Sequence, residues 1–114
     1  MADKIPKDTE QKIQQLQMLE QNMQQLLGQR QQYGAQLLEM DSALTELKDA
    51  KESYKIIGNI MIKKTKDELD KDLKSKKEMV ELRIKSLEKQ EKQLKDKASS
   101  LQADVMSALQ AKSK

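Results

Sequence analysis

Two heptad-patterned stretches lie on either side of Gly58-Asn59, and this mirrored pattern restricts the possible folds more than any other feature of the sequence. Each stretch is a ladder of apolar residues that advances in alternating steps of three and four, interrupted upstream by Arg30 and downstream by Lys77 and Glu91. Such spacing is the seam pattern of a coiled coil. The upstream members are Leu16, Leu19, Met23, Leu26, Tyr33, Leu37, Met40, Leu44 and Leu47, and the downstream members are Leu73, Val80, Ile84, Leu87, Leu94, Ala98, Leu101, Val105 and Ala108.

The two ladders fit together as an antiparallel pair. Opposed residues in such a pair have numbers with a constant sum, and a centre between Gly58 and Asn59 sets this sum to 117. Every a position then faces a d position, which chance would produce about once in seven for a heptad repeat. The same register places Arg30 and Glu91 in neighbouring layers. This predicts an ion pair between them, and the alternative is that both side chains extend separately into solvent.

The composition favours a thin seam over a compact core. The 114 residues include no Trp, Phe, Cys or His, and 36% of them are charged. Without His or Cys, the commonest general bases, nucleophiles and zinc ligands are missing. The three glycines are isolated in the sequence, so no phosphate-binding loop is present. We therefore expect no enzymatic activity, no cofactor and no metal site. We also expect no membrane span and no signal peptide, with the cytoplasm as the default location.

Charge is distributed unevenly between the two halves of the chain. Residues 1–52 contain six basic and nine acidic side chains, for a net charge of −3, whereas residues 53–114 contain sixteen and ten, for +6. A basic half is compatible with nucleic-acid binding. However, its lysines follow acidic residues at i,i+4 spacing, as in Asp70–Lys74, which is typical of a solvated helix face. We favour the solvated face.

A short β-prone run, from Tyr54 to Ile62, separates the ladders. It predicts two strands around Gly58-Asn59, because Gly in the first central position suits a type II′ turn. Such a hairpin has apolar residues on both faces and two open edges, and a lone hairpin is marginal in water. We therefore predict an assembly element that pairs with other hairpins, the alternative being a simple tight bend. The assembly residues are Tyr54, Ile56, Ile57, Ile60, Met61 and Ile62.

The start of the second helix has its own signal. Thr65 and Glu68 form a capping box, with Thr65 as the N-cap. The predicted fold is dominated by α-helix and consists of a long antiparallel two-helix coiled coil joined by a short β-hairpin. We expect one domain over residues 1–114, with helices over about 9–52 and 66–111 and the hairpin over 54–63. The junction between Leu47 and Tyr54 is the least defined boundary.

The hairpin segment resembles the prefoldin family, in particular its archaeal beta-type subunits. The similarity is most specific in Tyr54-Lys55-Ile56-Ile57-Gly58-Asn59-Ile60-Met61-Ile62, leading into Lys66-Asp67-Glu68-Leu69, and it covers nearly the whole chain. The resemblance implies an ATP-independent chaperone, a hexamer of two alpha-type and four beta-type subunits whose hairpins form an oligomeric β-barrel. It implies unfolded client proteins and a group II chaperonin as further partners, and neither a membrane nor a nucleic acid.

The resemblance also assigns a role to the ends of the ladders farthest from the hairpin. There the seam has no further layers to cover it, and partial unwinding would expose an adaptable apolar surface that contains methionine. The alternative is that these residues simply close the coiled coil. A structural scaffold without client binding and a basic nucleic-acid-binding helical protein stay open as other functions. The candidate client-binding residues are Ile13, Leu16, Leu19, Leu101, Val105, Met106 and Leu109.

Overall fold

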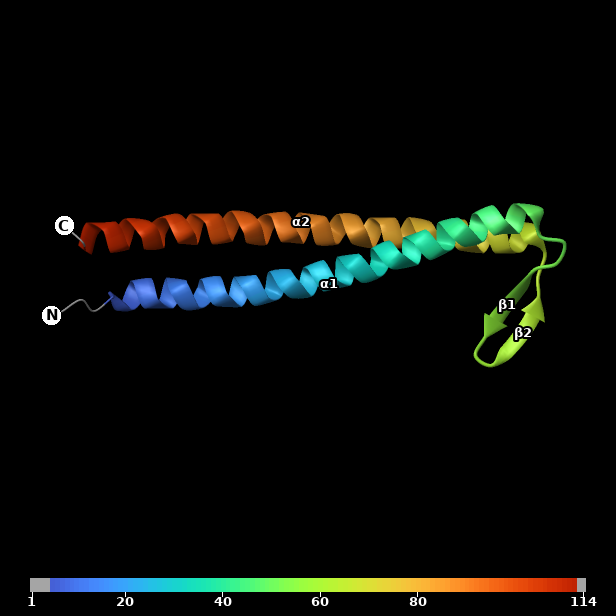
Figure 1. The fold of residues 1–114 in the computed structure, drawn as a ribbon, viewed down its shortest axis with the longest axis horizontal. Coiled ribbons are helices and arrows are strands. Elements are labelled where there is room, and N and C mark those ends of the chain that lie inside the picture. The colour runs from blue at the N-terminus through green and yellow to red at the C-terminus, as the bar shows by residue number, and fades with distance from the viewer. Residues whose placement is uncertain (1–4, 113–114) are drawn as a thin grey trace. The chain divides into compact units, whose positions relative to one another are not determined.

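The computed structural model describes residues 5–112, which form two long helices and one antiparallel hairpin (Figure 1). The elements in chain order are α1 (Lys7–Asp49), β1 (Tyr54–Ile57), β2 (Ile60–Lys63) and α2 (Lys66–Lys112). α1 begins directly after Pro6, whose carbonyl accepts a hydrogen bond from the Glu10 amide, and Pro is well tolerated at a helix start. α1 ends at Asp49, before the expected boundary near residue 52, because the Ala50 amide bonds the Leu47 carbonyl and tightens the last turn.

The chain divides into two compact units, and each contains a part of both helices. The first unit comprises the described residues of Met1–Gln29 and Leu87–Lys114, and the second comprises Arg30–Ser86, including the hairpin. In both units the ladder residues are the shielded ones and their neighbours are exposed. Among residues 5–112 no large side chain is fully buried, because each layer of a two-helix seam is covered from one side only.

The second unit confirms the antiparallel register of the helices. Val80 is buried, with 8% of its surface exposed. Lys77 Nζ lies 2.7 Å from Asp41 Oδ1, and Arg83 Nη1 donates a hydrogen bond of 3.3 Å to the Tyr33 hydroxyl. Residue numbers thus rise along α1 as they fall along α2. Both pairs sum to within one of the predicted value of 117.

The first unit has the same antiparallel arrangement. Lys12 Nζ lies 3.6 Å from Asp104 Oδ2, again within one residue of the predicted register. Thr9 is 3% exposed, so the buried seam continues on α1 beyond the apolar ladder that the sequence reveals. The buried apolar residues of this unit are Leu19, Leu87 and Val105.

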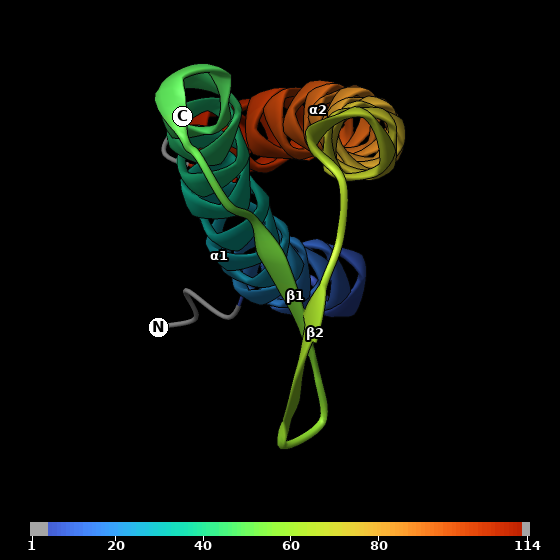
Figure 2. The same ribbon diagram turned by 90° about the vertical axis from the view of Figure 1, so that its right-hand side faces the viewer.

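The hairpin has the predicted pairing and turn. Ile57 is opposite Ile60 and Tyr54 is opposite Lys63, so these pairs also sum to 117. Gly58 has a φ of +60°, whereas the φ of Asn59 is not positive, which is the combination found in a type II′ turn. Figure 2 shows β1 leaving the end of α1 and β2 leading into the start of α2.

Thr65 is the N-cap of α2, which confirms the Thr65 half of the predicted capping box. The Glu68 amide donates a hydrogen bond of 3.2 Å to Thr65 Oγ1, and the Leu69 amide donates one of 3.1 Å to the Thr65 carbonyl. The Glu68 carboxylate lies 3.8 Å from Lys64 Nζ. Negative charge in this first turn is favourable because the N-terminus of a helix carries partial positive charge.

Candidate assembly and client-binding surfaces

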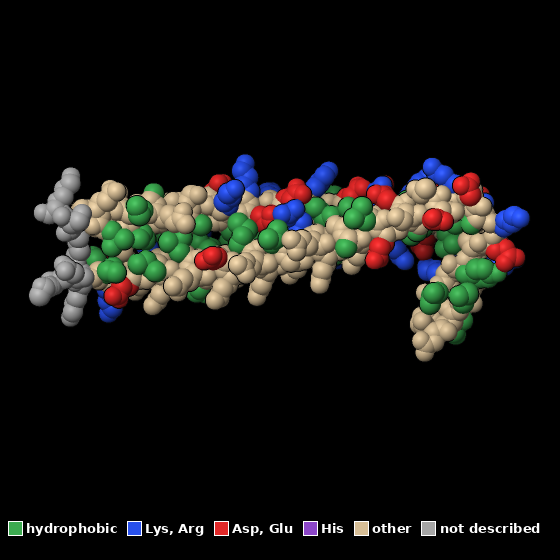
Figure 3. Space-filling view, in the orientation of Figure 1, with side chains coloured by type: hydrophobic (Ala, Val, Ile, Leu, Met, Phe, Trp, Pro, Cys, Tyr) green, Lys and Arg blue, Asp and Glu red, His purple; other side chains and the backbone are tan. Residues whose placement is uncertain are grey.

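All six apolar side chains assigned to assembly are exposed. Their exposed fractions range from 38% for Ile62 to 68% for Ile56. Figure 3 shows apolar side chains on the surface of the hairpin. Single exposed apolar residues are normal, but a contiguous group on one small element is typical of an interaction surface. The assembly role itself stays a prediction.

Strand pairing divides these residues between the two faces of the hairpin. Directly opposed residues share a face, and successive residues along a strand alternate. Each face therefore carries three apolar side chains and one lysine. A partner that covers only one face leaves the apolar side chains of the other face in water. One face has Ile57, Ile60, Ile62 and Lys55, and the other has Tyr54, Ile56, Met61 and Lys63.

The edges of the hairpin carry backbone groups without a partner strand. A two-residue turn makes the pair beside it a hydrogen-bonded pair, and bonded and non-bonded pairs alternate along an antiparallel ladder. The N–H and C=O groups of Tyr54 and Ile56 in β1, and of Met61 and Lys63 in β2, therefore point outward. Such groups are the donors and acceptors that an added strand uses.

Ser53 and Lys64 close the base of the hairpin. The Lys64 amide donates a hydrogen bond of 3.0 Å to the Ser53 carbonyl, and Ser53 Oγ donates one of 2.6 Å to the Lys64 carbonyl. Ser53 is buried, at 9% exposure. The pair extends the ladder by one step and fixes where the strands leave the helices. Sequence reasoning missed Ser53, since a single serine in a linker carries no pattern.

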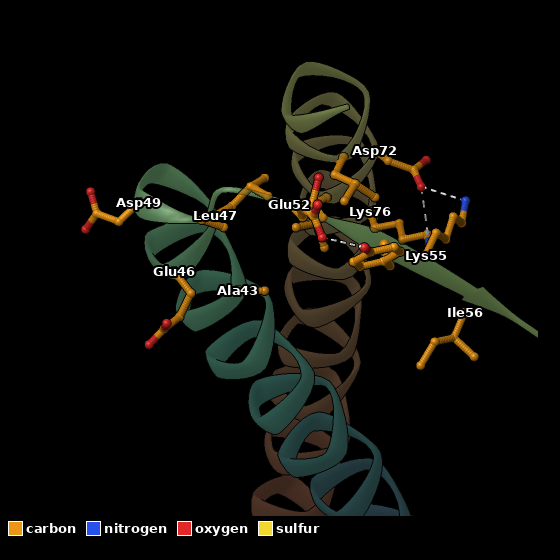
Figure 4. A pocket seen from close by; sticks show the side chains of 14 residues that line it. Ala43, Glu46, Leu47, Asp49, Glu52, Lys55, Ile56, Asp72 and Lys76 are labelled. Atoms are coloured by element: carbon orange, nitrogen blue, oxygen red, sulfur yellow. Dashed lines mark hydrogen bonds and ion pairs between the residues drawn. The ribbon is translucent and has the colours of Figure 1, made fainter. Parts of the chain in front are cut away.

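Lys55 and Tyr54 of β1 each bond a carboxylate, and the Lys55 bond joins β1 to α2 (Figure 4). Lys55 Nζ lies 2.7 Å from Asp72 Oδ2 on α2, and the hydrogen bond and charge of Lys55 lower the pKa of Asp72. The Tyr54 hydroxyl donates a hydrogen bond of 2.6 Å to Glu52 Oε2, which raises the pKa of Tyr54. The Lys55–Asp72 bond therefore ties β1 to α2, whereas the Tyr54–Glu52 bond is local to the chain just before β1.

Polar residues also fix the register of the seam. Asp41 forms a hydrogen bond with Lys77 and raises its pKa, and the Arg83 guanidinium lies 5.9 Å from the centre of the Tyr33 ring, within cation–π range. The sequence identifies Lys77 as a seam residue but not its partner, because Asp41 lies outside the ladder. Arg30 and Glu91 are each half-buried, and the ion pair between them stays a prediction.

The candidate client-binding residues on the ladders lie within a closed helix pair. Leu19 and Val105 are buried, at 9% and 8% exposure. The half-buried members of the set are Ile13, Leu16 and Leu101. Full access to these five side chains therefore requires local separation of the helices, which is the partial unwinding expected from the sequence.

Two candidate residues offer apolar surface without any such opening. Met106 is 57% exposed and Leu109 is 39% exposed, and they are neighbours one turn apart on α2. Ile5, at 37% exposure, is a further apolar residue at this end of the first unit. Sequence reasoning missed Ile5 because it precedes Pro6 and the ladder. Client binding stays a prediction for the whole set.

No group of three or more metal-ligating side chains within residues 5–112 could hold an ion. Neither of the two helices, over the same residues, is long and apolar enough to span a bilayer.

Comparison with known proteins decides the family. The family model described as "Prefoldin subunit" matches residues 10–112. The chain belongs to the prefoldin family. Prefoldin subunits are chaperone subunits that assemble with one another.

Prefoldin relatives match nearly the full length of the chain. Prefoldin subunit beta of Archaeoglobus fulgidus is 36% identical over 108 residues, which cover 92% of this chain and 93% of the relative. Prefoldin subunit beta of Caldivirga maquilingensis is 35% identical over 114 residues, with coverage of 97% and 94%. The crystal structure of the prefoldin beta subunit from Thermococcus strain KS-1 matches with a TM-score of 0.88 and 34% identity, over 95% of this chain and 97% of that one.

Proposed function

We propose that this chain is the beta-type subunit of a hexameric, ATP-independent chaperone that holds unfolded proteins and transfers them to a group II chaperonin. Two alpha-type and four beta-type subunits join through their hairpins in a β-barrel, and the complex acts in the cytoplasm. The observation that carries the proposal is the exposed hairpin of the prefoldin fold. Its six apolar side chains and open edges require other strands for cover.

The client surface lies at the far ends of the helices, in the first unit. Met106 and Leu109 provide an exposed apolar pair on α2, and Met adapts to varied apolar partners. Local separation of the helices adds Leu19 and Val105 to this surface. The client surface and the assembly hairpin belong to different units of the chain, so the two functions can be tested separately.

The test compares two pairs of exposed residues with the same chemistry and spacing. Met106→Ser with Leu109→Ser removes the proposed client surface, whereas Met79→Ser with Leu82→Ser is a matched control on α2, with exposures of 57% and 65%. Each variant is assembled with an alpha-type prefoldin subunit and mixed with a client that aggregates on dilution from denaturant, without ATP. We expect weaker suppression of light scattering for the first variant only, with the hexamer mass unchanged.

Truncation provides a stronger form of the same test. Removal of residues 1–15 and 102–114 is expected to abolish suppression and to leave assembly intact. Loss of assembly in this variant would overturn the division of roles. Equal suppression by the Met106/Leu109 and Met79/Leu82 variants would overturn the client surface and favour a scaffold without client binding.

A further inference from the structure

The two sides of the hairpin base carry opposite charge, and this asymmetry is not used by the functions above. A cavity of about 630 Å³ lies on the β1 side, where the last turns of α1 and the first turns of α2 meet β1 (Figure 4). Its apolar lining includes Leu47, Ile56 and Leu73. Around these residues lie four carboxylates and two lysines. The carboxylates are those of Glu46, Asp49, Glu52 and Asp72.

The uncompensated charge of this acidic cavity comes from Glu46 and Asp49 on α1 and from Glu52 just after it. Asp72 is paired with Lys55 at 2.7 Å, and Lys76 lies 3.9 Å from the same carboxylate, so both lysines of the lining are directed at Asp72. Within the described part of the chain, the side chains of Glu46 and Asp49 have neither an ion pair nor a hydrogen bond. Both are exposed, and Figure 4 shows them extending from the final turns of α1.

A second cavity, of about 340 Å³, lies at the hairpin base where β2 joins α2 and is basic. Glu52 is its one carboxylate among the lining residues, and it lies 3.8 Å from Lys63 at a contact where both side chains are more than half exposed. A pair this long and this exposed neutralises little charge. The lysines that line the basic cavity are Lys51, Lys63, Lys64 and Lys66.

Addition of β2 from a second chain to the β1 edge of the first chain would bring the basic cavity of the second chain beside the acidic cavity of the first. β1 runs away from the helices and β2 runs back toward them, so an antiparallel β2 from a second chain, added to the edge of β1, also runs toward the helices. The outward-facing pairs keep the register of the hairpin, with Ile56 opposite the neighbour's Met61 and Tyr54 opposite its Lys63, and both apolar faces continue into the next hairpin. The residues that follow β2 in the neighbour then lie beside the acidic cavity.

We propose that the acidic cavity beside β1 receives the basic segment Lys63–Lys66 of a second copy of this chain. The proposal rests on the assembly role given to the hairpin and specifies which edge takes which strand. A second copy is the occupant because both complementary surfaces are present on one chain. The contact is head-to-tail, since a different surface is used on each partner, and such contacts close into rings when the rotation permits. The outward-facing backbone groups of the β1 edge supply the hydrogen bonds of this contact. The opposite charges favour the neighbour's β2 over its β1 as the added strand.

Charge exchange between copies tests the proposal. One variant carries Glu46→Lys and Asp49→Lys, and the other carries Lys63→Glu and Lys66→Glu. A control variant, Glu78→Lys with Glu81→Lys, changes exposed α2 residues outside both cavities by the same charge and spacing. Self-association of the chain without other subunits is measured by analytical ultracentrifugation at low ionic strength, because salt screens such contacts.

We expect each cavity variant alone to associate at least about tenfold more weakly than the wild-type chain, a typical effect of like charges at an interface. An equimolar mixture of the two should recover association, since every contact in an alternating assembly is again between opposite charges, and the control should match the wild type. A monomeric wild-type chain, normal association of either variant alone, or a mixture that does not recover would each overturn the proposal. Failure of the proposed function gives a different result from failure of this contact. In that case charge exchange behaves as expected, but the wild-type assembly does not suppress client aggregation.

Discussion

Replacing Gly34 or Gly58 by alanine makes the same chemical change at two sites where opposite effects on stability are expected. An ideal Cβ at either position meets no atom within 4 Å, so neither substitution gains or loses a packing contact. The backbone conformation alone therefore sets the sign of the change in stability. Gly34 lies inside α1, where alanine is the better residue, whereas Gly58 has a φ of +60°, a conformation that disfavours any residue with a Cβ.

The magnitudes follow from the backbone conformation of each site. Gly34→Ala is expected to stabilise the helix by about 1 kcal/mol, which corresponds to a rise of about 4 °C in Tm for a chain of this size. Gly58→Ala is expected to cost the hairpin about 1–2 kcal/mol. Because tenfold in an equilibrium constant corresponds to about 1.4 kcal/mol, this cost lowers the protection of the Ile60 amide against hydrogen exchange by about 5- to 30-fold.

The two effects are measured on different elements at one fixed chain concentration, because assembly adds to apparent stability. Thermal unfolding followed by circular dichroism at 222 nm reports Gly34→Ala, and amide exchange followed by NMR reports Gly58→Ala. Gly28→Ala, also in α1 with no atom within 4 Å of its Cβ, is the control and should match Gly34→Ala. A lower Tm for Gly34→Ala, or unchanged protection in Gly58→Ala, would refute the reasoning.

Two further predictions concern the second unit. Val80→Ala should lower the free energy of unfolding by about 1–3 kcal/mol in a denaturant titration, because a buried seam residue loses two methyl groups. Leu82 is 65% exposed, so Leu82→Ala should change the free energy of unfolding by less than about 0.5 kcal/mol in the same titration. Equal losses for the two variants would contradict the assignment of Val80 to the seam. The Lys55–Asp72 pair should stabilise the fold fully above the ordinary aspartate pKa of 3.8 and lose this effect as the pH falls through the lowered pKa of Asp72. NMR titration of the Asp72 carboxyl carbon should therefore give a midpoint below that of the Lys55→Met variant, and an equal midpoint would show that Lys55 does not cause the shift.

Sequence was sufficient for the features that depend on local periodicity and local backbone chemistry. The heptad ladders gave the seam of both units and its register to within one residue, as the pairing of Asp41 with Lys77 shows. The Gly58-Asn59 turn and the Thr65 cap were predictable because each depends on the conformation of a few adjacent residues. The exposed apolar hairpin followed from the same local pattern.

Other features depend on which side chains the fold brings together, and these required the structure. The partners of Lys55 and Lys77 lie outside any repeating pattern, and Ser53 acquires its role only because the strands converge at its position. The exposures of the candidate client-binding residues also depend on how tightly the helices close, which periodicity does not report.

Sequence by itself thus determined the elements, their antiparallel order and the apolar bend, because local interactions and a repeating seam encode them directly. The tertiary structure alone decided which charged residues line each cavity at the hairpin base, because Asp72 of the basic half joins the acids of α1 there. In the sequence, acids and lysines alternate from Glu46 to Glu52, and all charged residues from Lys55 to Lys66 are lysines. The end of α1, the two linkers and the start of α2 place them in space, with carboxylates gathered beside β1 and lysines at the base of β2.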